Sequence, residues 1–555
     1  MGVKRHVLLA LVLSASACRE DVDLGGGPPS ACAAPCSSFV DRTVAARLGT
    51  PSDWFWGERT ELARPEIVYP LAGSIHPVNF EELTLQWKRL DRGQTLFRLR
   101  FFAPNLKRTY DAYVPCLATG GEGCRYQLPD PFFAGLRREL AGEEVELTVE
   151  ATDGAGGPVT KSNPLHFRFT GKPLENKGFY YWAAPGSTGV REALTLRLAV
   201  GARRPDPYIQ PQTTTNPFEC GGCHVVSRDG SEIAFTARTS DEYASSRKAG
   251  QLVVAQTDEL KPIIIADPAD VTKYDSSMLA LNEDGSRVLV SLAGRLEIRY
   301  VHDSPAPPRH DPGFVIGRYD DFQGKHAFFP EFSPGDDRVV VTLSDDTDLP
   351  VKTGAIATLN YDKALDTLSN LVVLLETPDE FHFYPTWSPD EKYIAFVSAP
   401  RDGVNASSNQ KNARLRLLRL EDRRLFELEN ATQGVGNWST LPKFAPFLSG
   451  DHDGRMFLTF TSKIDYGLLL RNTIHPADGR LPQLWMTAID ASLPIDPSSA
   501  PVWLPFQSFV DRSHFGYWTE KVVCREGVTD SMDAPVPPCG PGEKCVSGVC
   551  IYQPR

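Results

Sequence analysis

Two cysteines and a histidine lie together in the segment Cys220-Gly221-Gly222-Cys223-His224. At this spacing two thiols can form thioether bonds to the vinyl groups of a haem, and the adjacent imidazole can then bind the iron as proximal ligand. The sequence therefore predicts a covalent haem c held by Cys220, Cys223 and His224. A C-x-x-C disulfide or dithiol is the alternative interpretation. A zinc site is disfavoured, because it would need two further Cys or His nearby.

The start of the chain has the pattern of an export signal. Lys4 and Arg5 precede an apolar run over 7–13 that is too short to span a membrane, and small residues lead to Cys18. The segment resembles a bacterial lipobox and predicts a lipoprotein signal peptide over 1–18, with lipidation of Cys18. Because Ala15 stands where Leu is usual, ordinary cleavage and secretion stay open. Arg19 follows Cys18 instead of Asp, which favours the outer membrane, with either face possible.

An exported chain is permitted disulfides, and ten of the eleven cysteines remain if Cys18 carries lipid. Close spacing predicts local bridges between Cys32 and Cys36 and between Cys116 and Cys124. The tail over 524–555 holds four cysteines with little else to form a core, so two bridges are expected there. Their pairing stays open; they are Cys524, Cys539, Cys545 and Cys550.

Composition limits the class of protein. The formal net charge is −12, which argues against a sequence-independent nucleic-acid binder, since such a protein needs a basic face. The chain has 44 Gly and 45 Pro, too many for a helical bundle, while 41% hydrophobic residues permit a substantial core.

The elements that would position the haem motif come from a repeat. A strand, a Ser-Pro-Asp-Gly-like turn and an alternating β-rich strand recur, with equivalent turn positions 51 to 57 residues apart. These positions are Ser227, Asn282, Ser333, Ser388 and Ala445. A further strand follows each unit, as at 251–255 and 483–487. Repeats of this kind predict β-propeller blades.

Five units are visible, and strand-like segments at 178–182 and 194–199 predict a sixth, closed by 502–506. We therefore expect an all-β fold, a six-bladed or seven-bladed propeller over 175–523. In the repeat alignment His224 takes the position of Pro330 and Pro385, so the motif opens the innermost strand of a blade.

The units Ser333-Pro334 and Ser388-Pro389-Asp390, with the apolar strands after them, resemble the PD40 (WD40-like) repeats of TolB-type propellers. The resemblance covers roughly 176–520 and implies a periplasmic, non-enzymatic protein that binds partners. Cys220-x-x-Cys223-His224 departs from ordinary TolB proteins and looks like a branch in which the haem motif is grafted onto a blade.

The opposite axial ligand of the haem is expected from a segment that matches the motif in another blade. Met278, His326 and His382 lie a few residues before a blade's turn and are the distal ligand candidates. An ordinary core position is the competing interpretation for each.

Two further regions precede the propeller. Residues 19–63 begin with a Gly-rich and Pro-rich stretch and predict a flexible tether. Strand-like runs over 64–174, with Trp87 on an early strand, resemble a fibronectin type III or Ig-like β-sandwich, a module that usually acts as a spacer or binding surface.

No hydrolase or transferase signature is found: Gly-x-Ser-x-Gly, His-Glu-x-x-His and phosphate-binding Gly loops are all missing from the sequence. Two functions from different classes remain. One is a cell-envelope lipoprotein cytochrome for electron transfer or redox sensing, with an envelope redox partner. The other is a TolB-like protein-interaction scaffold in which Cys220 and Cys223 form a disulfide. Neither requires a nucleic acid.

Overall fold

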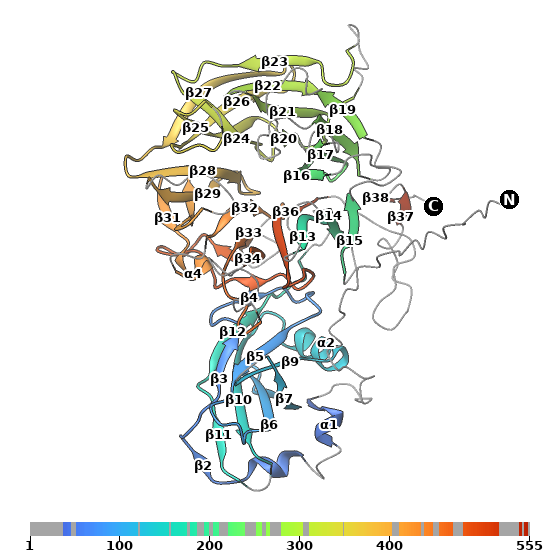
Figure 1. Cartoon of the computed structure of the whole chain (residues 1–555), viewed down its shortest axis with the longest axis vertical. Coiled ribbons are helices and arrows are strands. Elements are labelled where there is room, and N and C mark those ends of the chain that lie inside the picture. Colours follow the sequence, from blue (N-terminus) through green and yellow to red (C-terminus); the bar gives the residue numbers. More distant parts are fainter. Residues whose placement is uncertain are drawn as a thin grey trace, which may run out of the picture.

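The computed structural model describes residues 37–45, 51–119, 122–154, 157–174, 178–185, 194–198, 204–209, 220–238, 251–257, 262–266, 279–292, 294–302, 310–347, 349–401, 410–434, 438–447, 454–469, 481–520, 543–546 and 549–552. Figure 1 shows two stacked bodies, an N-terminal module in blue and a larger array of sheets in green to red. Cys18, Cys32, Cys36, Met278, Cys524 and Cys539 lie outside the described residues. No described helix is long and apolar enough to cross a membrane.

The N-terminal module is built from two sheets. The larger has the order β1-β7-β6-β10-β11-β2, with β12 on β10 and β4 on β12, and the smaller has the order β3-β5-β9-β8. Trp87 of the smaller sheet and Phe97 of the larger are fully buried, with ring centroids 5.2 Å apart, so the two sheets share a core. The strands are β1 (Ser38–Val40), β2 (Arg59–Thr60), β3 (Glu66–Tyr69), β4 (Ile75–His76), β5 (Thr84–Lys88), β6 (Leu96–Ala103), β7 (Arg108–Pro115), β8 (Leu117–Ala118), β9 (Gly123–Gln127), β10 (Glu144–Thr152), β11 (Val159–Lys161) and β12 (Leu165–Phe169).

The module differs from the sequence-based expectation in one boundary and in one helix. Strands β1 and β2 pair in parallel with β7 and β11, so part of the predicted tether belongs to the sheet and the boundary at residue 64 is wrong. The short helix α1 (Arg42–Ala45) and the 3₁₀ helix η1 (Pro51–Phe55) lie between them. Helix α2 (Asp130–Glu139) was not predicted, although it buries Phe132, Phe133 and Leu136 at helical spacing.

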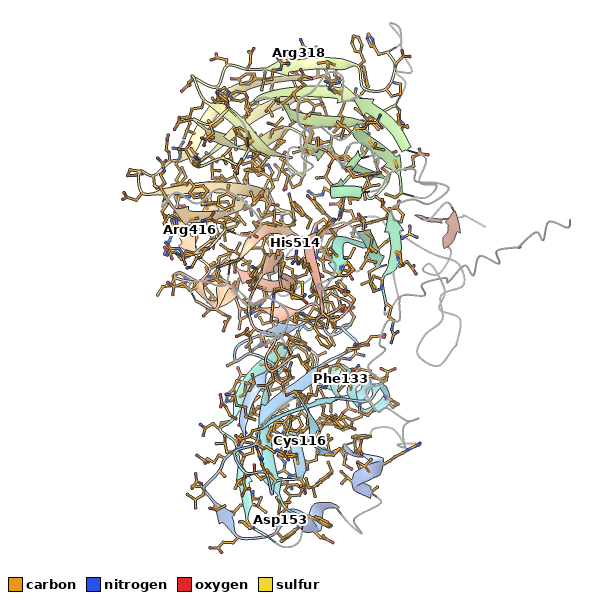
Figure 2. The ribbon with its side chains drawn as sticks, viewed as in Figure 1. Cys116, Phe133, Asp153, Arg318, Arg416 and His514 are labelled. Atoms are coloured by element: carbon orange, nitrogen blue, oxygen red, sulfur yellow. A yellow bond between two sulfur atoms is a disulfide. The ribbon has the colours of Figure 1, made fainter. Side chains whose placement is uncertain are left out.

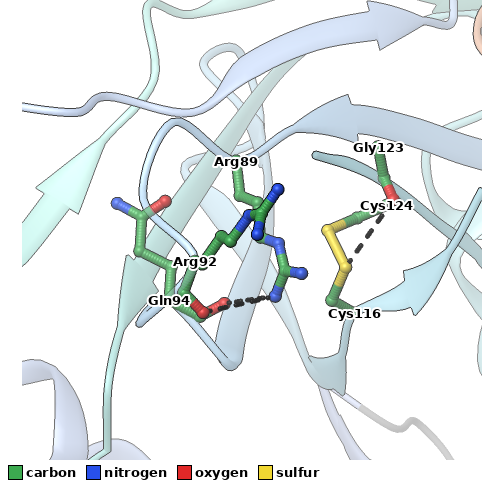
Figure 3. Close-up of a disulfide and its surroundings, with 6 residues drawn as sticks. All are labelled: Arg89, Arg92, Gln94, Cys116, Gly123 and Cys124. Carbon is green, nitrogen blue, oxygen red and sulfur yellow. Dashed lines mark hydrogen bonds between the residues drawn. A yellow bond between two sulfur atoms is a disulfide. The ribbon is translucent and has the colours of Figure 1, made fainter. Parts of the chain in front are cut away.

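Cys116 and Cys124 form a disulfide, as their spacing predicts. Cys124 is fully buried on β9 opposite Trp87, and Cys116 lies at the end of β7, so the bond joins the two sheets (Figure 3). Nearby, the Arg89 guanidinium donates to the carbonyl of Gln94 at 3.4 Å. In the tail, β37 (Glu543–Val546) and β38 (Val549–Tyr552) form a hairpin that places Cys545 directly opposite Cys550; the two bridges expected among the four tail cysteines stay a prediction, with their pairing open.

The described residues from 178 to 520 form six four-stranded antiparallel sheets. Their innermost strands contact one another in the order β16, β20, β24, β28, β32 and β36, and β36 also contacts β16, so the array closes into a ring. This is the arrangement of a β-propeller. The sheets are β36-β13-β14-β15, β16-β17-β18-β19, β20-β21-β22-β23, β24-β25-β26-β27, β28-β29-β30-β31 and β32-β33-β34-β35.

The bounds of these strands follow the repeat closely. They are β13 (Phe179–Pro185), β14 (Leu194–Leu198), β15 (Asp206–Ile209), β16 (Cys220–Val226), β17 (Glu232–Arg238), β18 (Gln251–Gln256), β19 (Pro262–Ala266), β20 (Leu279–Leu281), β21 (Arg287–Leu292), β22 (Arg295–Tyr300), β23 (Val315–Tyr319), β24 (His326–Phe332), β25 (Arg338–Ser344), β26 (Ala355–Asp362), β27 (Thr367–Leu375), β28 (Glu380–Trp387), β29 (Tyr393–Pro400), β30 (Arg414–Arg419), β31 (Leu425–Glu427), β32 (Thr440–Phe444), β33 (Arg455–Ser462), β34 (Gln483–Asp490), β35 (Val502–Trp503) and β36 (Asp511–Trp518). The short helix α4 (Glu429–Thr432) follows β31.

One expectation about closure is wrong. Val502–Trp503 is the outermost strand of the β32 sheet and pairs with Trp485 and Met486. The strand that completes the first sheet is β36, which pairs with β13 from Phe179↔Trp518 to Pro185↔Asp511. Val502-Trp503 lies at the boundary with the N-terminal module: the Trp503 ring stacks on Tyr466 of the propeller at 4.1 Å, and the Trp503 backbone N–H donates to the hydroxyl of Tyr69 in the module at 3.1 Å.

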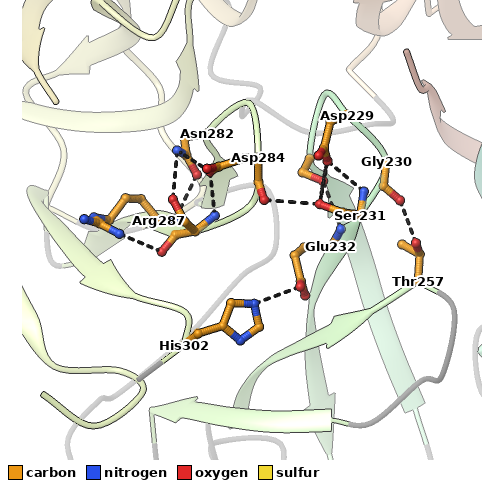
Figure 4. Close-up of polar contacts among 11 residues, drawn as sticks. Asp229, Gly230, Ser231, Glu232, Thr257, Asn282, Asp284, Arg287 and His302 are labelled. Carbon is orange, nitrogen blue, oxygen red and sulfur yellow. Dashed lines mark hydrogen bonds and ion pairs between the residues drawn. The ribbon is translucent and has the colours of Figure 1, made fainter. Parts of the chain in front are cut away.

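The Ser-Pro-Asp-Gly-like turn has a clear physical role. Its first side chain accepts a hydrogen bond from the backbone N–H five residues later, at 2.9 Å for Ser227 and Ser388, 2.8 Å for Asn282 and 3.1 Å for Ser333. Gly230 and Gly285 have positive φ, which Gly adopts without a steric penalty. Adjacent turns are also joined, since the Ser231 hydroxyl donates to the carbonyl of Asp284 at 3.1 Å (Figure 4).

We expect Ser388→Ala to lower the free energy of unfolding by about 1–2 kcal/mol, because it removes a hydroxyl that donates to Asp390 at 2.7 Å and accepts from the Tyr393 N–H at 2.9 Å in a buried turn. Urea unfolding measures the change. The matched control is Ser492→Ala, which removes a similar contact, to Asp490 at 2.5 Å, in an exposed turn and should have little effect. Equal losses in both variants would contradict this role of the repeat.

Candidate functional site

The Cys220-x-x-Cys223-His224 motif forms the start of β16, the innermost strand of the second sheet. Its register with β17 runs Cys220↔Arg238 and Gly221↔Ala237, then shifts and resumes at His224↔Phe235. A shift of the same kind occurs in β24, β28 and β32, where pairing resumes two residues before the first residue of the turn, compared with three residues before it in β16. The motif therefore occupies a bulge that recurs in other innermost strands.

The bulge has a specific backbone conformation in the other sheets. Phe329, Tyr384, Leu441 and Phe515 each have a φ between 51° and 53°, in the left-handed region that residues with side chains rarely adopt. Pro330, Pro385, Pro442 and Gly516 follow them, and His224 takes this position in β16. The bulge lets the strand turn its side chains as it enters the centre of the ring.

His224 is fully buried between the first and second sheets. Its ring centroid lies 5.5 Å from that of Tyr517 on β36, and neither ring nitrogen has a partner at full hydrogen-bond geometry in the part of the chain that the structure describes, although the Tyr180 backbone is a polar neighbour of the ring. Burial lowers the pKa of His224 to about 3, against a small opposing effect of the Tyr180 backbone. The imidazole is therefore neutral, which is the form that binds a metal ion.

The expected distal ligands differ in their environments. His382 is buried, and both ring nitrogens have hydrogen-bond partners, the hydroxyl of Ser398 at 2.8 Å and that of Thr377 at 3.0 Å. It would have to lose one of these bonds to bind iron, so its geometry disfavours that role. His326 is partly exposed at the first residue of β24, beside Gly294.

A polar network lies in the channel at the centre of the ring. The Glu331 carboxylate accepts from the Thr386 hydroxyl at 2.7 Å, from the Trp387 N–H at 3.0 Å and from the Lys443 ammonium. The Lys443 nitrogen also lies 5.2 Å from the centre of the Tyr517 ring. Burial alone would lower the pKa of Lys443, but the Glu331 charge and the Tyr517 hydroxyl outweigh it and raise the pKa.

This channel contains a cavity of about 110 Å³ whose lining includes Glu331, Lys443, Trp387, Tyr517 and Trp518. The volume suits several water molecules or a small ligand. His224 is not among the lining residues, although its neighbours Val225 and Val226 are. The imidazole therefore faces the space between two sheets, and the channel is a separate place for a ligand.

Sequence reasoning missed another buried histidine, on the strand that closes the ring. His514 on β36 is buried and pairs with Trp182 of β13, and their rings lie 5.4 Å apart. Figure 2 labels His514 near the middle of the molecule, on the strand that completes the first sheet. The strand lacks the Ser-Pro-Asp-Gly turn, but His514-Phe515-Gly516-Tyr517-Trp518-Thr519 aligns with 328–333, and that signal could have found it.

Other clusters offer no metal site: the described residues contain no group of three or more His, Cys, Asp or Glu side chains placed to hold a metal ion. A haem does not require three protein ligands, because the porphyrin supplies four of the iron ligands. A neutral, buried imidazole without a described partner at full hydrogen-bond geometry, next to two cysteines in sequence, fits a haem ligand.

Comparison with known proteins leaves the family open. No protein-family model and no curated protein matches the chain. Solved structures with similarity include a chain described as TolB from Agrobacterium tumefaciens, 12% identical over 62% of this chain and 99% of that one, with a TM-score of 0.34.

Two other solved structures have enzymatic descriptions. A puromycin-hydrolyzing peptidase from Mycobacterium tuberculosis is 12% identical over 60% of this chain and 53% of that one, with a TM-score of 0.30. A chain described as a 6-phosphogluconolactonase from Bacteroides uniformis is 13% identical over 60% and 95%, with a TM-score of 0.26. Likenesses this distant carry no argument about function.

The buried histidines predict a pH dependence of stability. Burial lowers the pKa of His382 to about 4, so the unfolded chain takes up a proton near pH 6.5 that the folded chain does not, and stability falls as the pH drops. Between pH 7 and pH 5 this residue should account for a loss of about 1–2 kcal/mol. In urea unfolding at these two pH values, the free energy of unfolding of His382→Gln should fall less between pH 7 and pH 5 than that of the wild type.

His166, whose side chain is half exposed, is the matched control, and His166→Gln should retain the dependence of the wild type. An identical pH dependence in His382→Gln and the wild type would contradict the argument from burial.

Proposed function

We propose that this chain is an exported cell-envelope lipoprotein whose β-propeller carries a covalent c-type haem and serves electron transfer or redox sensing. The observation that carries the proposal is His224, a fully buried and neutral imidazole without a partner at full hydrogen-bond geometry in the described chain. A buried polar group without a partner lowers the stability of the folded state. Iron ligation would remove this cost.

Each residue of the motif has a distinct task in this proposal. Cys220 and Cys223 would attach the haem through their sulfurs, and His224 would bind the iron. When bound, the haem supplies a one-electron redox centre. Tyr517 packs against His224 and restricts the orientation of the imidazole, and the surrounding apolar core excludes water from it.

The place of the motif in the fold supports a site between sheets. Val226 on the same strand packs with Tyr180 of the first sheet and Phe235 of the second, so side chains on this face of β16 point toward β13 and β36. His224 lies two residues before Val226 and shares this face.

The second function is a protein-interaction scaffold in which Cys220 and Cys223 form a disulfide. One observation favours it, namely the channel network of Glu331 and Lys443, which offers paired charges to a small ligand or to a peptide end without any redox group. Partners would then be other envelope proteins. The two functions are separated by whether the purified protein contains covalent haem.

The finer architecture also belongs to this proposal. We take the six sheets to be the complete set of blades, because β36 and β16 already bring the ring to closure. The N-terminal module would be a fibronectin III/Ig-like β-sandwich that acts as a spacer from the membrane. Cys18 would carry the lipid that anchors the protein in the outer membrane, and the tail would be held by disulfides.

A haem stain on a denaturing gel tests the proposed function, because thioether-bound haem survives denaturation whereas a disulfide gives no signal. The full chain, exported from a host that matures c-type cytochromes, should stain and show a reduced haem spectrum. The Cys220→Ala/Cys223→Ala variant should lose the stain, and Cys116→Ala/Cys124→Ala, which removes the Cys116–Cys124 disulfide, should retain it. Wild-type protein that folds without haem would favour the scaffold.

The lipid anchor has its own test. Cys18→Ser should abolish incorporation of radiolabelled palmitate and move the protein from the membrane fraction to the soluble exported fraction, because a thiol is needed for thioether lipidation. Arg19→Lys, which keeps the positive charge at the adjacent position, serves as the control. Release of the wild type into the soluble fraction would show ordinary secretion instead.

A further inference from the structure

The repeat places prolines around the cavity in the central channel. Its lining includes Pro334, Pro389 and Pro446, each of which follows the first residue of a turn, and Pro330 of one bulge. Proline has no backbone N–H, so these positions offer a ligand apolar surface and no hydrogen-bond donor. Polar recognition in the channel therefore depends on the few polar side chains of the lining.

Two indole rings add to the apolar wall, and hydrogen bonds hold both in place. Trp387 Nε1 donates to the carbonyl of Glu331 at 3.3 Å, and Trp518 Nε1 donates to the Thr459 hydroxyl at 2.8 Å. Because both indole N–H groups are used within the protein, the rings present their apolar surface in fixed positions. Such a wall exists before a ligand binds, which lowers the cost of ordering the site.

The acidic side chain of the lining, Glu331, is occupied by protein donors. One carboxylate oxygen accepts from the Thr386 hydroxyl at 2.7 Å and from the Trp387 N–H at 3.0 Å, and the other accepts from the Lys443 ammonium. A cationic ligand would have to displace Lys443 to reach this carboxylate. Glu331 therefore holds the ammonium in the cavity and is a poor site for a second cation.

Two cationic side chains line the same cavity, Lys443 and Arg228. The Lys443 ammonium has three N–H groups, and the Glu331 carboxylate and the Tyr517 hydroxyl account for two of them among the described residues. Arg228 donates through Nε to Glu520, which is not a lining residue, and its guanidinium has further N–H groups. Each cation is 21% exposed, so a ligand in the cavity can reach both.

The volume of the cavity, about 110 Å³, limits the size of a ligand. An apolar cavity of about 150 Å³ binds benzene, so this one admits a short chain or about one ring. The acid group is also limited, because a phosphate would bring up to about two negative charges next to the Glu331 carboxylate. A carboxylate brings one charge and two acceptor oxygens, which matches the two cations.

We propose that the central channel binds a small organic monocarboxylate, whose acid group contacts Lys443 and Arg228 and whose apolar body packs on Trp387 and Trp518. The proposal rests on the channel of the second proposed function and names the ligand class of that site. It does not depend on a haem, since His224 does not line the cavity.

Calorimetric titration of the full chain with benzoate tests the proposal. We expect saturable binding of benzoate and no binding of benzyl alcohol, a neutral compound of similar size. The Glu331→Gln/Lys443→Met variant removes both members of the ion pair and leaves neither charge unpaired, so it should fold and bind benzoate about tenfold or more weakly, because a charge-assisted hydrogen bond is lost. Lys363→Met, which removes an exposed lysine after β26, should bind as the wild type does.

Glu331→Gln alone distinguishes a site for anions from a site for cations. Glutamine keeps an acceptor for Thr386 and Trp387 and releases Lys443 from its ion pair, so benzoate should bind as tightly as to the wild type or more tightly. Urea unfolding verifies that the variant is folded. Weaker benzoate binding in the folded variant, binding of benzylammonium in preference to benzoate, or no benzoate binding by the wild type would overturn the proposal.

A short peptide that ends in Phe with a free carboxylate, compared with its amide, tests the other source of a carboxylate. If the peptide binds more tightly than benzoate and the amide does not bind, the channel recognises a protein terminus, and the proposal of a small ligand is wrong. Haem content is measured separately on the same preparation. Protein that binds benzoate but has no haem would reject the haem function and support this proposal, and haem protein that does not bind benzoate would do the reverse.

Discussion

The pairing of β36 with β13 is the interaction on which the propeller depends. It joins Asp511–Trp518 to Phe179–Pro185, so a strand from the end of the propeller segment completes the sheet with which that segment begins. The closure is reinforced at the turns, where Arg228 forms an ion pair with Glu520 and the Glu520 N–H donates to the carbonyl of Arg228 at 2.8 Å. Without this strand the first and second sheets would each expose an apolar face.

The same closure creates both places where the protein could bind something. Tyr517 of β36 contacts His224 on one side and lies near Lys443 on the other, so one side chain borders both the inter-sheet space and the central channel. The channel charges are balanced by each other, since Glu331 accepts from Lys443, whereas the His224 ring has no partner at full hydrogen-bond geometry among the described residues. In the proposed function a haem iron would bind the His224 ring. The Glu331–Lys443 pair in the channel needs no redox group.

The N-terminal module is held to the propeller by aromatic packing. The Tyr69 ring lies 4.9 Å from that of Tyr466, and the Tyr69 hydroxyl accepts from the Trp503 N–H at 3.1 Å. Gln86 accepts from the Leu468 N–H at 2.6 Å. One core cluster runs from this module into the fourth to sixth sheets, and such a continuous apolar contact favours a fixed arrangement of the two bodies.

The sequence by itself determined the repeat, the turn chemistry and the motif, because these are local: Ser388 and Asp390 make their turn wherever the blade lies, and Cys116 is close to Cys124 along the chain. It did not determine the closing strand. Residues 511–518 lack the repeat's turn, and 502–503 has a similar apolar pattern, so only long-range pairing distinguishes them. The contact of His224 with Tyr517 was likewise decided by tertiary structure, because nearly 300 residues separate them and ring closure alone brings them together.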